Sequence, residues 1–168
     1  MARWSGLILL FALAVGACAT QPPVAPGGTA VAATKHVFVV RHMQKQTGDD
    51  PALSAEGEAG ARRLAAMLAD KGIVAIFATK TRRAMATAAP LGQRLGIAVT
   101  PYDPRSPELL AAAVSAAPGP VLVVGHSNTV HDLVGRFGGT PPPPLTEQDY
   151  GTVFIIKADG SVATMAVR

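Results

Sequence analysis

Short apolar stretches alternate with helical patterns along most of this chain, and this alternation limits the possible folds more than any other feature. Residues 36–40 (HVFVV), 73–78, 97–102 and 121–124 (VLVV) have the length and β-branched content of buried strands. Segments with helical periodicity separate these strands. The resulting order, βαβαβαβ, predicts an α/β fold of three layers, in which helices cover both faces of a mostly parallel central sheet.

The first helix of this pattern should begin after Ser54, whose hydroxyl can accept a hydrogen bond from a backbone N–H of the first turn. An apolar stripe follows along residues 61–68, and Gly72 is placed to end the helix. Gly57 and Gly60 weaken the first turns because glycine loses the most backbone entropy on folding. The sequence nevertheless predicts a helix between the first two strands.

The remaining elements follow from similar signals. A second helix should run from about 83 to 95 with a kink at Pro90, and a third from 107 to 117, where a proline suits the first helical position. Residues 152–157 and 162–167 flank the turn sequence ADGS. This pattern predicts two antiparallel strands that close the domain.

The first residues of the chain have the layout of a secretory signal. One positive charge lies among residues 1–6, and residues 7–17 (LILLFALAVGA) are apolar or small without interruption. As a helix this run would extend only about 16 Å, against roughly 30 Å for the hydrocarbon core of a bilayer. It is therefore a poor permanent membrane span, and we expect residues 1–17 to be a cleaved signal peptide.

Residues 15–18 (VGAC) resemble a bacterial lipobox, which implies cleavage before Cys18 and lipidation of that cysteine. The alternative is an ordinary signal peptide with Cys18 as a bystander. Residues 18–34 carry no charge and are rich in Pro, Gly, Ala and Thr, which predicts a flexible linker to a domain at 35–168. We expect an exported protein on the periplasmic side, and Ala19 favours the outer membrane by resemblance to proteobacterial lipoproteins.

Charge and cysteine content exclude several classes of function. The formal net charge is +4, but Lys and Arg form no dense block and the few aromatic residues are not interleaved with them. A nucleic-acid-binding surface would require both features, so we expect no nucleic-acid partner. The single cysteine excludes an intramolecular disulfide and a multi-cysteine zinc site.

Polar residues follow three of the expected strands at the point where each strand ends. Arg41 and His42 follow the first strand, a turn at 79–83 follows the second, and His126 follows the fourth. Ligands of open α/β sheets bind outside the carboxyl ends of the strands, so these side chains can meet in one pocket. Arginine binds phosphate oxygens bidentately and a neutral imidazole can attack phosphorus. The set therefore points to phosphate chemistry that needs no metal.

Three short motifs occur in a fixed order: VRH at 40–42, RAMATA at 83–88 and GHS at 125–127. They resemble the R-H-G motif, the R-A-x-x-T-A helix start and the second histidine of the histidine phosphatase (phosphoglycerate mutase-like) superfamily. The resemblance extends over residues 36–135 and is to the small phosphohistidine-phosphatase-like subgroup. Met43 departs from the pattern, since glycine is usual there, and this change can alter the loop geometry.

The resemblance implies a role for each motif residue. His42 is the nucleophile that forms a phosphohistidine intermediate, which water later hydrolyses. Arg41 and Arg83 hold the phosphoryl oxygens, and His126 donates a hydrogen bond to them as their charge grows. The resemblance also implies phosphomonoester or phosphoramidate substrates, including phosphohistidine, and no cofactor.

Other residues can assist at this site. Ser127 and Asn128 can donate secondary hydrogen bonds to the substrate, and Lys45 can add positive potential. A leaving alkoxide needs a proton, and Glu108 is the first candidate for this general acid, with Asp103 second. Either carboxylate can instead cap the third helix. An enzyme without such an acid would act on substrates with easier leaving groups, such as phosphoramidates.

Two further functions are compatible with the sequence. GHSNT at 125–129 is one residue short of the G-x-S-x-G nucleophile elbow, so a serine hydrolase using Ser127 is an alternative that leaves Arg41, His42 and Arg83 unexplained. A catalytically silent, lipid-anchored module could bind a phosphorylated ligand in the same pocket. A mutase is disfavoured because phosphoglycerate mutases are longer and carry additional substrate-binding insertions.

Overall fold

The structure is a computed structural model that describes Met1 and residues 35–168. The expected cleavage and lipidation of Cys18, and the linker at 18–34, fall outside the described residues. None of the described helices is long and apolar enough to cross a membrane.

Residues 35–168 contain one six-stranded sheet with the strand order β3-β2-β4-β1-β5-β6. The pairs β2·β3, β2·β4 and β1·β4 are parallel, whereas β1·β5 and β5·β6 are antiparallel. This sheet confirms the predicted mostly parallel fold with a C-terminal antiparallel hairpin. The strands are β1 (Val37–Arg41), β2 (Ala75–Thr79), β3 (Val99–Tyr102), β4 (Val121–Gly125), β5 (Thr152–Ile156) and β6 (Val162–Ala166).

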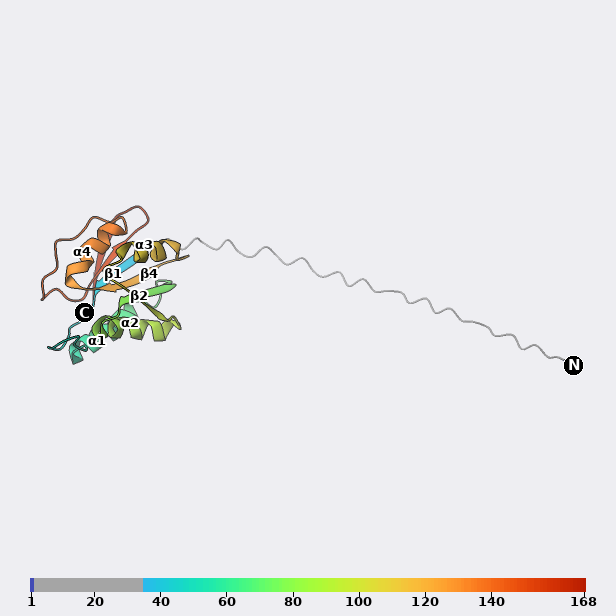
Figure 1. Ribbon diagram of the computed structural model, residues 1–168, viewed down its shortest axis with the longest axis horizontal. Helices are drawn as coiled ribbons and strands as arrows, with labels where there is room; N and C mark the ends of the chain where they lie inside the picture. Colours follow the sequence, from blue (N-terminus) through green and yellow to red (C-terminus); the bar gives the residue numbers. More distant parts are fainter. Residues whose placement is uncertain (2–34) are drawn as a thin grey trace. The chain divides into compact units, whose positions relative to one another are not determined.

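Helices cover both faces of this sheet, as predicted. Helices α1 (Ala55–Leu68) and α2 (Arg82–Leu95) lie on one face, and α3 (Pro107–Ala116) and α4 (Ser127–Arg136) lie on the other (Figure 1). The pattern predicted from the sequence ends at the strand before α4 and does not include this helix. Its buried residues Val130, Leu133 and Val134 have helical spacing, so the periodicity needed to predict it was present.

The core consists of two apolar clusters separated by the sheet. Alternate residues of β1 point to opposite faces, so Phe38 and Val40 pack with α1 and α2, while Val37 and Val39 pack with α3 and α4. All of these side chains are buried. Because both faces are covered, β1 is a continuous apolar run rather than an alternating one.

The site is positioned by the junction between β1 and β4. These two strands are parallel neighbours, and Arg41 is paired with Gly125 at their carboxyl ends. The helix that follows β1 lies on one face of the sheet, whereas the helix that follows β4 lies on the other. The chain therefore diverges at this point and leaves a crevice, into which the residues that follow each strand project.

Three local expectations need correction or comment. Helix α1 ends at Leu68 with Ala69 as its C-cap, so Gly72 does not terminate it directly. Helix α2 continues through Pro90 as one helix. The glycines of α1 have a role that helix propensity does not reveal: a Cβ at Gly57 would lie 2.0 Å from the backbone oxygen of Gln44. Glycine is required there because the segment after β1 crosses the helix in contact with its backbone.

Replacing Gly57 by alanine should therefore destabilise the protein, although alanine favours a helix by about 1 kcal/mol over glycine. We expect Gly57→Ala to lower the free energy of unfolding by at least about 2 kcal/mol, because backbone atoms must move to relieve the clash. Urea denaturation would measure this change in the free energy of unfolding. Glu58→Ala, at an exposed position of the same helix, is the control and should change stability by less than about 0.5 kcal/mol. A stabilised Gly57→Ala would contradict this account.

Candidate active site

A cavity of about 450 Å³ lies at the carboxyl ends of β1 and β4 and contains almost all of the residues predicted from the motifs. Four of its lining residues are cationic or imidazole side chains that sequence analysis assigned to catalysis. Glu108 is the predicted catalytic residue that does not line it. The lining residues are Arg41, His42, Lys45, Arg83, His126, Ser127, Asn128 and Glu147.

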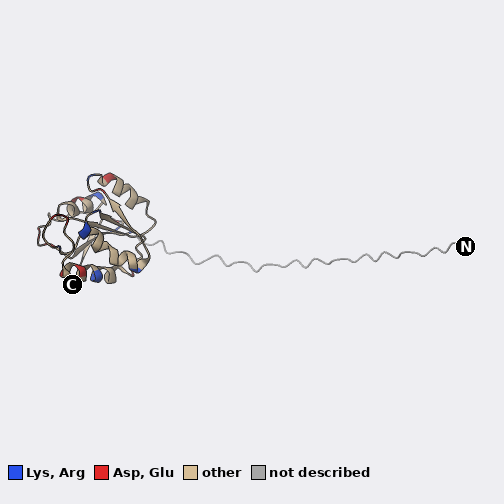
Figure 2. Cartoon of the chain, turned by 60° about the horizontal axis from the view of Figure 1, so that its bottom comes forward, with Lys and Arg blue, Asp and Glu red and all other residues tan. Residues whose placement is uncertain are grey.

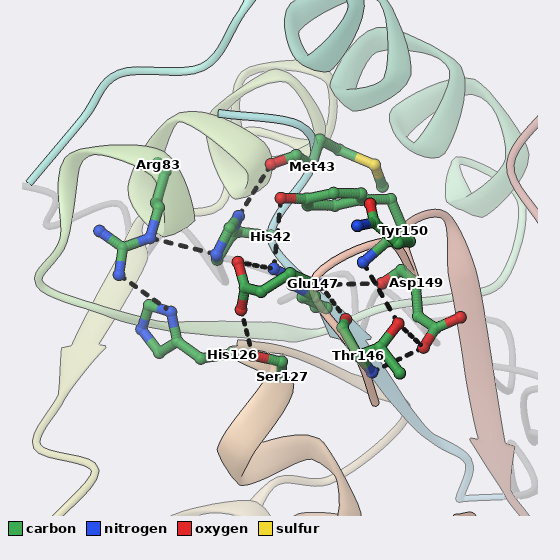
Figure 3. A network of polar contacts seen from close by, with 11 residues as sticks. His42, Met43, Arg83, His126, Ser127, Thr146, Glu147, Asp149 and Tyr150 are labelled. Carbon is green, nitrogen blue, oxygen red and sulfur yellow. Dashed lines mark hydrogen bonds and ion pairs between the residues drawn. The ribbon is translucent and has the colours of Figure 1, made fainter. Parts of the chain in front are cut away.

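His42 is held in one orientation and, in this geometry, one tautomer. Its Nδ1 lies 2.8 Å from the backbone oxygen of Met43, which can only accept, so Nδ1 carries the hydrogen. The other nitrogen, Nε2, accepts a hydrogen bond of 3.1 Å from Nε of Arg83 (Figure 3). Nε2 is therefore unprotonated, the form of imidazole that can act as a nucleophile, and its lone pair becomes available once Arg83 donates to a ligand instead.

Both histidines are kept neutral by their surroundings. Burial is the main cause that lowers the pKa of His42 to about 4, and the nearby His126 and the guanidinium groups of Arg83 and Arg41 contribute to this shift against the opposing effect of the Met43 hydrogen bond. Burial, followed by Arg83 and Arg41, also lowers the pKa of His126 to about 4. The two rings lie edge to face with centroids 5.2 Å apart. At neutral pH the cavity thus holds two uncharged imidazoles.

Arg83 connects the two imidazoles. It comes from the first turn of α2, and besides its contact with His42 its Nη2 lies 3.4 Å from Nδ1 of His126. Its Nη1 pairs with Asp50 at 3.4 Å, and Asp50 also accepts from the backbone N–H of Arg82. Sequence analysis did not single out Asp50. The ion pair with Asp50 holds the guanidinium of Arg83 at the side of the cavity, with Nε and Nη2 directed toward the two imidazoles.

His126 is positioned from two sides. Its ring Nε2 lies 2.7 Å from Oγ1 of Thr79, the buried last residue of β2. Its backbone N–H donates to Oγ1 of Thr129 at the start of α4. The ring therefore has one nitrogen bound to the sheet and the other, Nδ1, toward Arg83.

Arg41 is buried to 2% exposure, and its partners come from a loop far away in the sequence. Its Nη1 donates to the backbone oxygens of Thr146 and Asp149, at 2.6 and 3.3 Å. Its Nη2 donates to Oε2 of Glu147 and to the hydroxyl of Tyr150, both at 3.2 Å, and its guanidinium lies 4.0 Å from the centre of the Tyr150 ring. Its buried Nε has no hydrogen-bond partner among the described residues.

Glu147 spans part of the cavity wall. One carboxylate oxygen accepts from Arg41 and the other accepts from the hydroxyl of Ser127 at 3.1 Å (Figure 3). Hydrogen bonding from Ser127 and the charge of Arg41 lower the pKa of this carboxyl. The side chain is 65% exposed, which places it at the mouth rather than the floor. The carboxylate of Glu147 thus accepts from Arg41 and Ser127, two donors that were predicted from the sequence to bind the substrate.

The predicted general acids are not in the cavity. Glu108 is exposed in the first turn of α3, on the face of the sheet that α4 also covers. Asp103 is bound to Arg105, with oxygens 2.9 and 3.1 Å from its guanidinium nitrogens. The turn between β3 and α3 directs both carboxylates to solvent. The prediction that one of them lines the cavity is therefore wrong. In the part of the chain that the structure describes, Glu147 is the carboxylate that lines it.

Met43, which departs from the usual glycine, is accommodated in the core behind His42. Its side chain is buried in the core on the side of α1, where Gly60 leaves room for it. Its backbone N–H donates to Oγ1 of Thr87 at 3.0 Å, and that hydroxyl donates to the backbone oxygen of Arg83. The buried threonine of the RAMATA motif therefore holds the His42 segment against α2.

A second cavity, of about 620 Å³, lies at the opposite end of β1 and contains none of the motif residues. Lys35, Phe137 and Lys157 are among its lining residues. Lys and Arg are interspersed with Asp and Glu over the folded part in the view of Figure 2. Among the described residues, no group of three or more His, Cys, Asp or Glu side chains is placed to hold a metal ion. Because the motif residues line the smaller cavity, of about 450 Å³, we assign the chemistry to that cavity.

Comparison with known proteins supports this assignment. Residues 37–105, which contain His42 and Arg83, match the histidine phosphatase superfamily (branch 1). The matched segment is less than half of the chain. No curated protein matches the chain.

Solved structures share the fold over most of the chain. The protein histidine phosphatase SixA, complexed with tungstate, is 21% identical with a TM-score of 0.60, over 78% of this chain and 96% of SixA. A mycobacterial glucosyl-3-phosphoglycerate phosphatase with inorganic phosphate is 18% identical with a TM-score of 0.62, over 79% and 95% of the two chains. At this identity the similarity establishes the phosphoglycerate mutase-like fold, including the region after residue 105.

The position of Glu147 predicts that this carboxylate competes with phosphate for Arg41. We expect Glu147→Gln to bind inorganic phosphate about threefold more tightly or better, since an exposed ion pair is worth up to about 1 kcal/mol. Isothermal titration calorimetry would measure the dissociation constant. Glu58→Gln removes the same charge from an exposed position on α1 and should leave phosphate binding unchanged. Unchanged or weaker binding by Glu147→Gln would show that the carboxylate does not compete.

Proposed function

We propose that this chain is a phosphatase that hydrolyses phosphomonoesters or phosphoramidates through a phosphohistidine on His42. The observation that carries the proposal is the state of His42: its Nδ1–H is bound to the backbone oxygen of Met43, which leaves Nε2 unprotonated at a cavity lined by cations, where it accepts from Arg83. The superfamily match over residues 37–105 supports it. Phosphatases of the same fold that hold tungstate or phosphate support an oxyanion as the ligand.

The first chemical step transfers the phosphoryl group to the protein. Nε2 of His42 attacks phosphorus, the bond from phosphorus to the leaving oxygen or nitrogen breaks, and the leaving atom takes the bonding electron pair and then a proton. In the second step water attacks the phosphohistidine, the P–N bond breaks and its electrons return to Nε2. The products are inorganic phosphate and the neutral imidazole, so the steps use this chain's side chains and water.

The surrounding cations would stabilise the transferred group. Arg83 already donates toward Nε2 of His42 and can donate to a phosphoryl oxygen placed there. Arg41 can do the same with Nη2 once Glu147 gives way. His126 lies beside His42, with the two ring centroids 5.2 Å apart. Donors fixed in advance stabilise the charge that develops on the equatorial oxygens without reorganisation during the reaction.

The leaving group narrows the class of substrate. Glu147 is ionised at neutral pH because hydrogen bonding and the charge of Arg41 lower its pKa, so it accepts rather than donates a proton. A poor alkoxide leaving group would therefore lack a general acid from this wall. We favour phosphoramidates, or esters of acidic alcohols and phenols, whose leaving groups need less assistance.

The alternatives receive less support from the geometry. A serine hydrolase would need an imidazole to accept the proton of Ser127, but that hydroxyl donates to Glu147, and the ring of His126 is directed to Thr79 and Arg83. A silent phosphate-binding module would have the same pocket. Turnover distinguishes it from an enzyme.

We also propose that the protein is exported, anchored through a lipid on Cys18 and held on the periplasmic side, with the outer membrane as the expected location. The support is the resemblance of residues 15–18 to a lipobox and the linker composition of residues 18–34. The domain at 35–168 would then meet phosphorylated substrates outside the cytoplasm. The identity of these substrates is open to a screen.

Removing the nucleophile should abolish turnover. In an assay of aryl phosphate hydrolysis, we expect His42→Ala to lower kcat by more than about a thousandfold, as loss of a nucleophile does in other covalent enzymes. The parent should accumulate an acid-labile phosphoprotein, detectable by ³¹P NMR at the shift of a phosphoimidazole. His36→Ala, a substitution outside the cavity, is the matched control and should retain activity. A parent that binds phosphate but hydrolyses nothing would be a binding module.

Lipidation should depend on Cys18. We expect the full chain expressed in a Gram-negative host to partition into detergent and to carry the mass of a diacylglyceryl group and an acyl chain at its N-terminus. Cys18→Ala should lose both properties, because lipidation requires the thiol. Mass spectrometry of the membrane-extracted protein provides the measurement. An unmodified mature N-terminus in the parent chain would refute the anchor.

A further inference from the structure

The role proposed for His126 depends on which of its nitrogens carries hydrogen. Nδ1 is the ring nitrogen directed toward Arg83, while Nε2 faces the hydroxyl of Thr79. A neutral imidazole has one N–H, so His126 can donate to a phosphoryl oxygen from Nδ1 only if Nε2 accepts. The hydroxyl of Thr79 can act as either donor or acceptor. The direction of this 2.7 Å hydrogen bond therefore decides whether Nδ1 can donate to a phosphoryl oxygen.

The contacts beyond Thr79 favour one direction. Oγ1 of Thr79 lies 3.2 Å from Oγ1 of Thr81, the N-cap of α2, and Thr81 accepts the backbone N–H of Ala84 at 3.4 Å. If Thr81 donates to Thr79, and Thr79 donates to Nε2 of His126, every hydroxyl hydrogen in this row has an acceptor. In the reverse direction the hydrogen of Thr81 has no acceptor among the described contacts. Thr81 is only half-buried, so in that direction its hydrogen must be donated to solvent, and the row uses all of its hydrogens within the protein only when Nε2 accepts.

The N-terminus of helix α2 also favours donation from Thr79 to His126. The N-terminus of α2 carries a partial positive charge, which favours hydroxyl oxygens toward the helix and hydroxyl hydrogens away from it. The hydrogen of Thr79 is then directed to His126. Because Thr79 is 1% exposed, water does not compete for this bond.

We propose that Thr79, supported by Thr81, is a positioning residue that sets the tautomer of His126 to Nδ1–H. Its hydroxyl donates to Nε2, and Nδ1–H then donates to an oxygen of the phosphoryl group. The inference rests on the proposed function for the identity of that group. It assigns Thr79 a role in the site although this residue does not line the cavity.

As a hydrogen bond, the contact between Arg83 and His126 requires Nδ1 to accept, because Nη2 of Arg83 can only donate, so it favours the other tautomer in the empty cavity. The distance from Nη2 of Arg83 to Nδ1 is 3.4 Å, which is long for an N–H···N hydrogen bond. With Nδ1 protonated, two donors face each other across this gap. An oxyanion between them accepts from both, so the arrangement favours an occupied site over an empty one.

The first test reads the tautomer directly and needs no variant chain beyond an assignment control. In the full chain labelled with ¹⁵N-histidine, protonated and unprotonated ring nitrogens are well separated, and His126→Asn identifies the signals by their loss. At pH 7 with inorganic phosphate, we expect Nδ1 of His126 to be protonated and Nε2 unprotonated. Protonation at Nε2 in the phosphate complex overturns the proposal.

The second test uses the hydroxyl itself. Thr79→Val preserves shape and should populate both tautomers and lower kcat for an aryl phosphate about tenfold, as expected for a lost hydrogen bond in the transition state. Thr79→Ser restores a hydroxyl and should recover kcat to within about twofold, which a packing role would not produce. Thr100→Val, at an exposed position of β3, is the matched control. An unchanged tautomer and kcat in Thr79→Val would overturn the proposal.

The two proposals fail in different ways. A parent chain that hydrolyses no phosphate compound but shows Nδ1–H in the phosphate complex overturns the proposed function and supports this inference. A parent chain that hydrolyses aryl phosphate but shows Nε2–H on His126 in the phosphate complex supports the function and overturns this inference.

Discussion

The guanidinium of Arg41 is almost completely buried at the carboxyl end of β1, and the architecture around the cavity depends on satisfying it. A buried cation without partners is strongly destabilising, so the chain must return to this point with acceptors. It does so through the segment at 146–150, which supplies two backbone oxygens, a carboxylate and an aromatic ring. One residue thus closes the wall of the cavity and offers a donor to the ligand.

The two histidines are held by opposite nitrogens. His42 is fixed through Nδ1 by a backbone carbonyl, which leaves Nε2 as an acceptor in the cavity, whereas His126 is fixed through Nε2 by Thr79, which leaves Nδ1. Burial and the neighbouring guanidinium groups lower both pKa values to about 4, so neither ring carries charge at neutral pH. The same imidazole group can then serve as a nucleophile at one position and as a donor at the other.

Packing behind the cavity determines how precisely the nucleophile is placed. The segment after β1 runs between α1 and α2, in contact with Gly57 on one side and hydrogen-bonded to Thr87 on the other. The side chain of Met43 fills the space that Gly60 leaves, so a large residue is accommodated where glycine is usual. Residues far from the chemistry in sequence therefore constrain the backbone that carries His42.

The sequence by itself determined the order of strands and helices as far as β4, the mostly parallel sheet, the hairpin and the convergence of Arg41, His42, Arg83 and His126. Periodicity reports which face of an element is buried, and residues at the carboxyl ends of neighbouring parallel strands must meet. Only the tertiary structure decided which carboxylate lines the cavity. Glu147 reaches Arg41 from 106 residues away through a loop without periodicity, while the turn before α3 directs Glu108 to solvent. Such contacts depend on how a loop folds back, and no local pattern of residue types encodes that path.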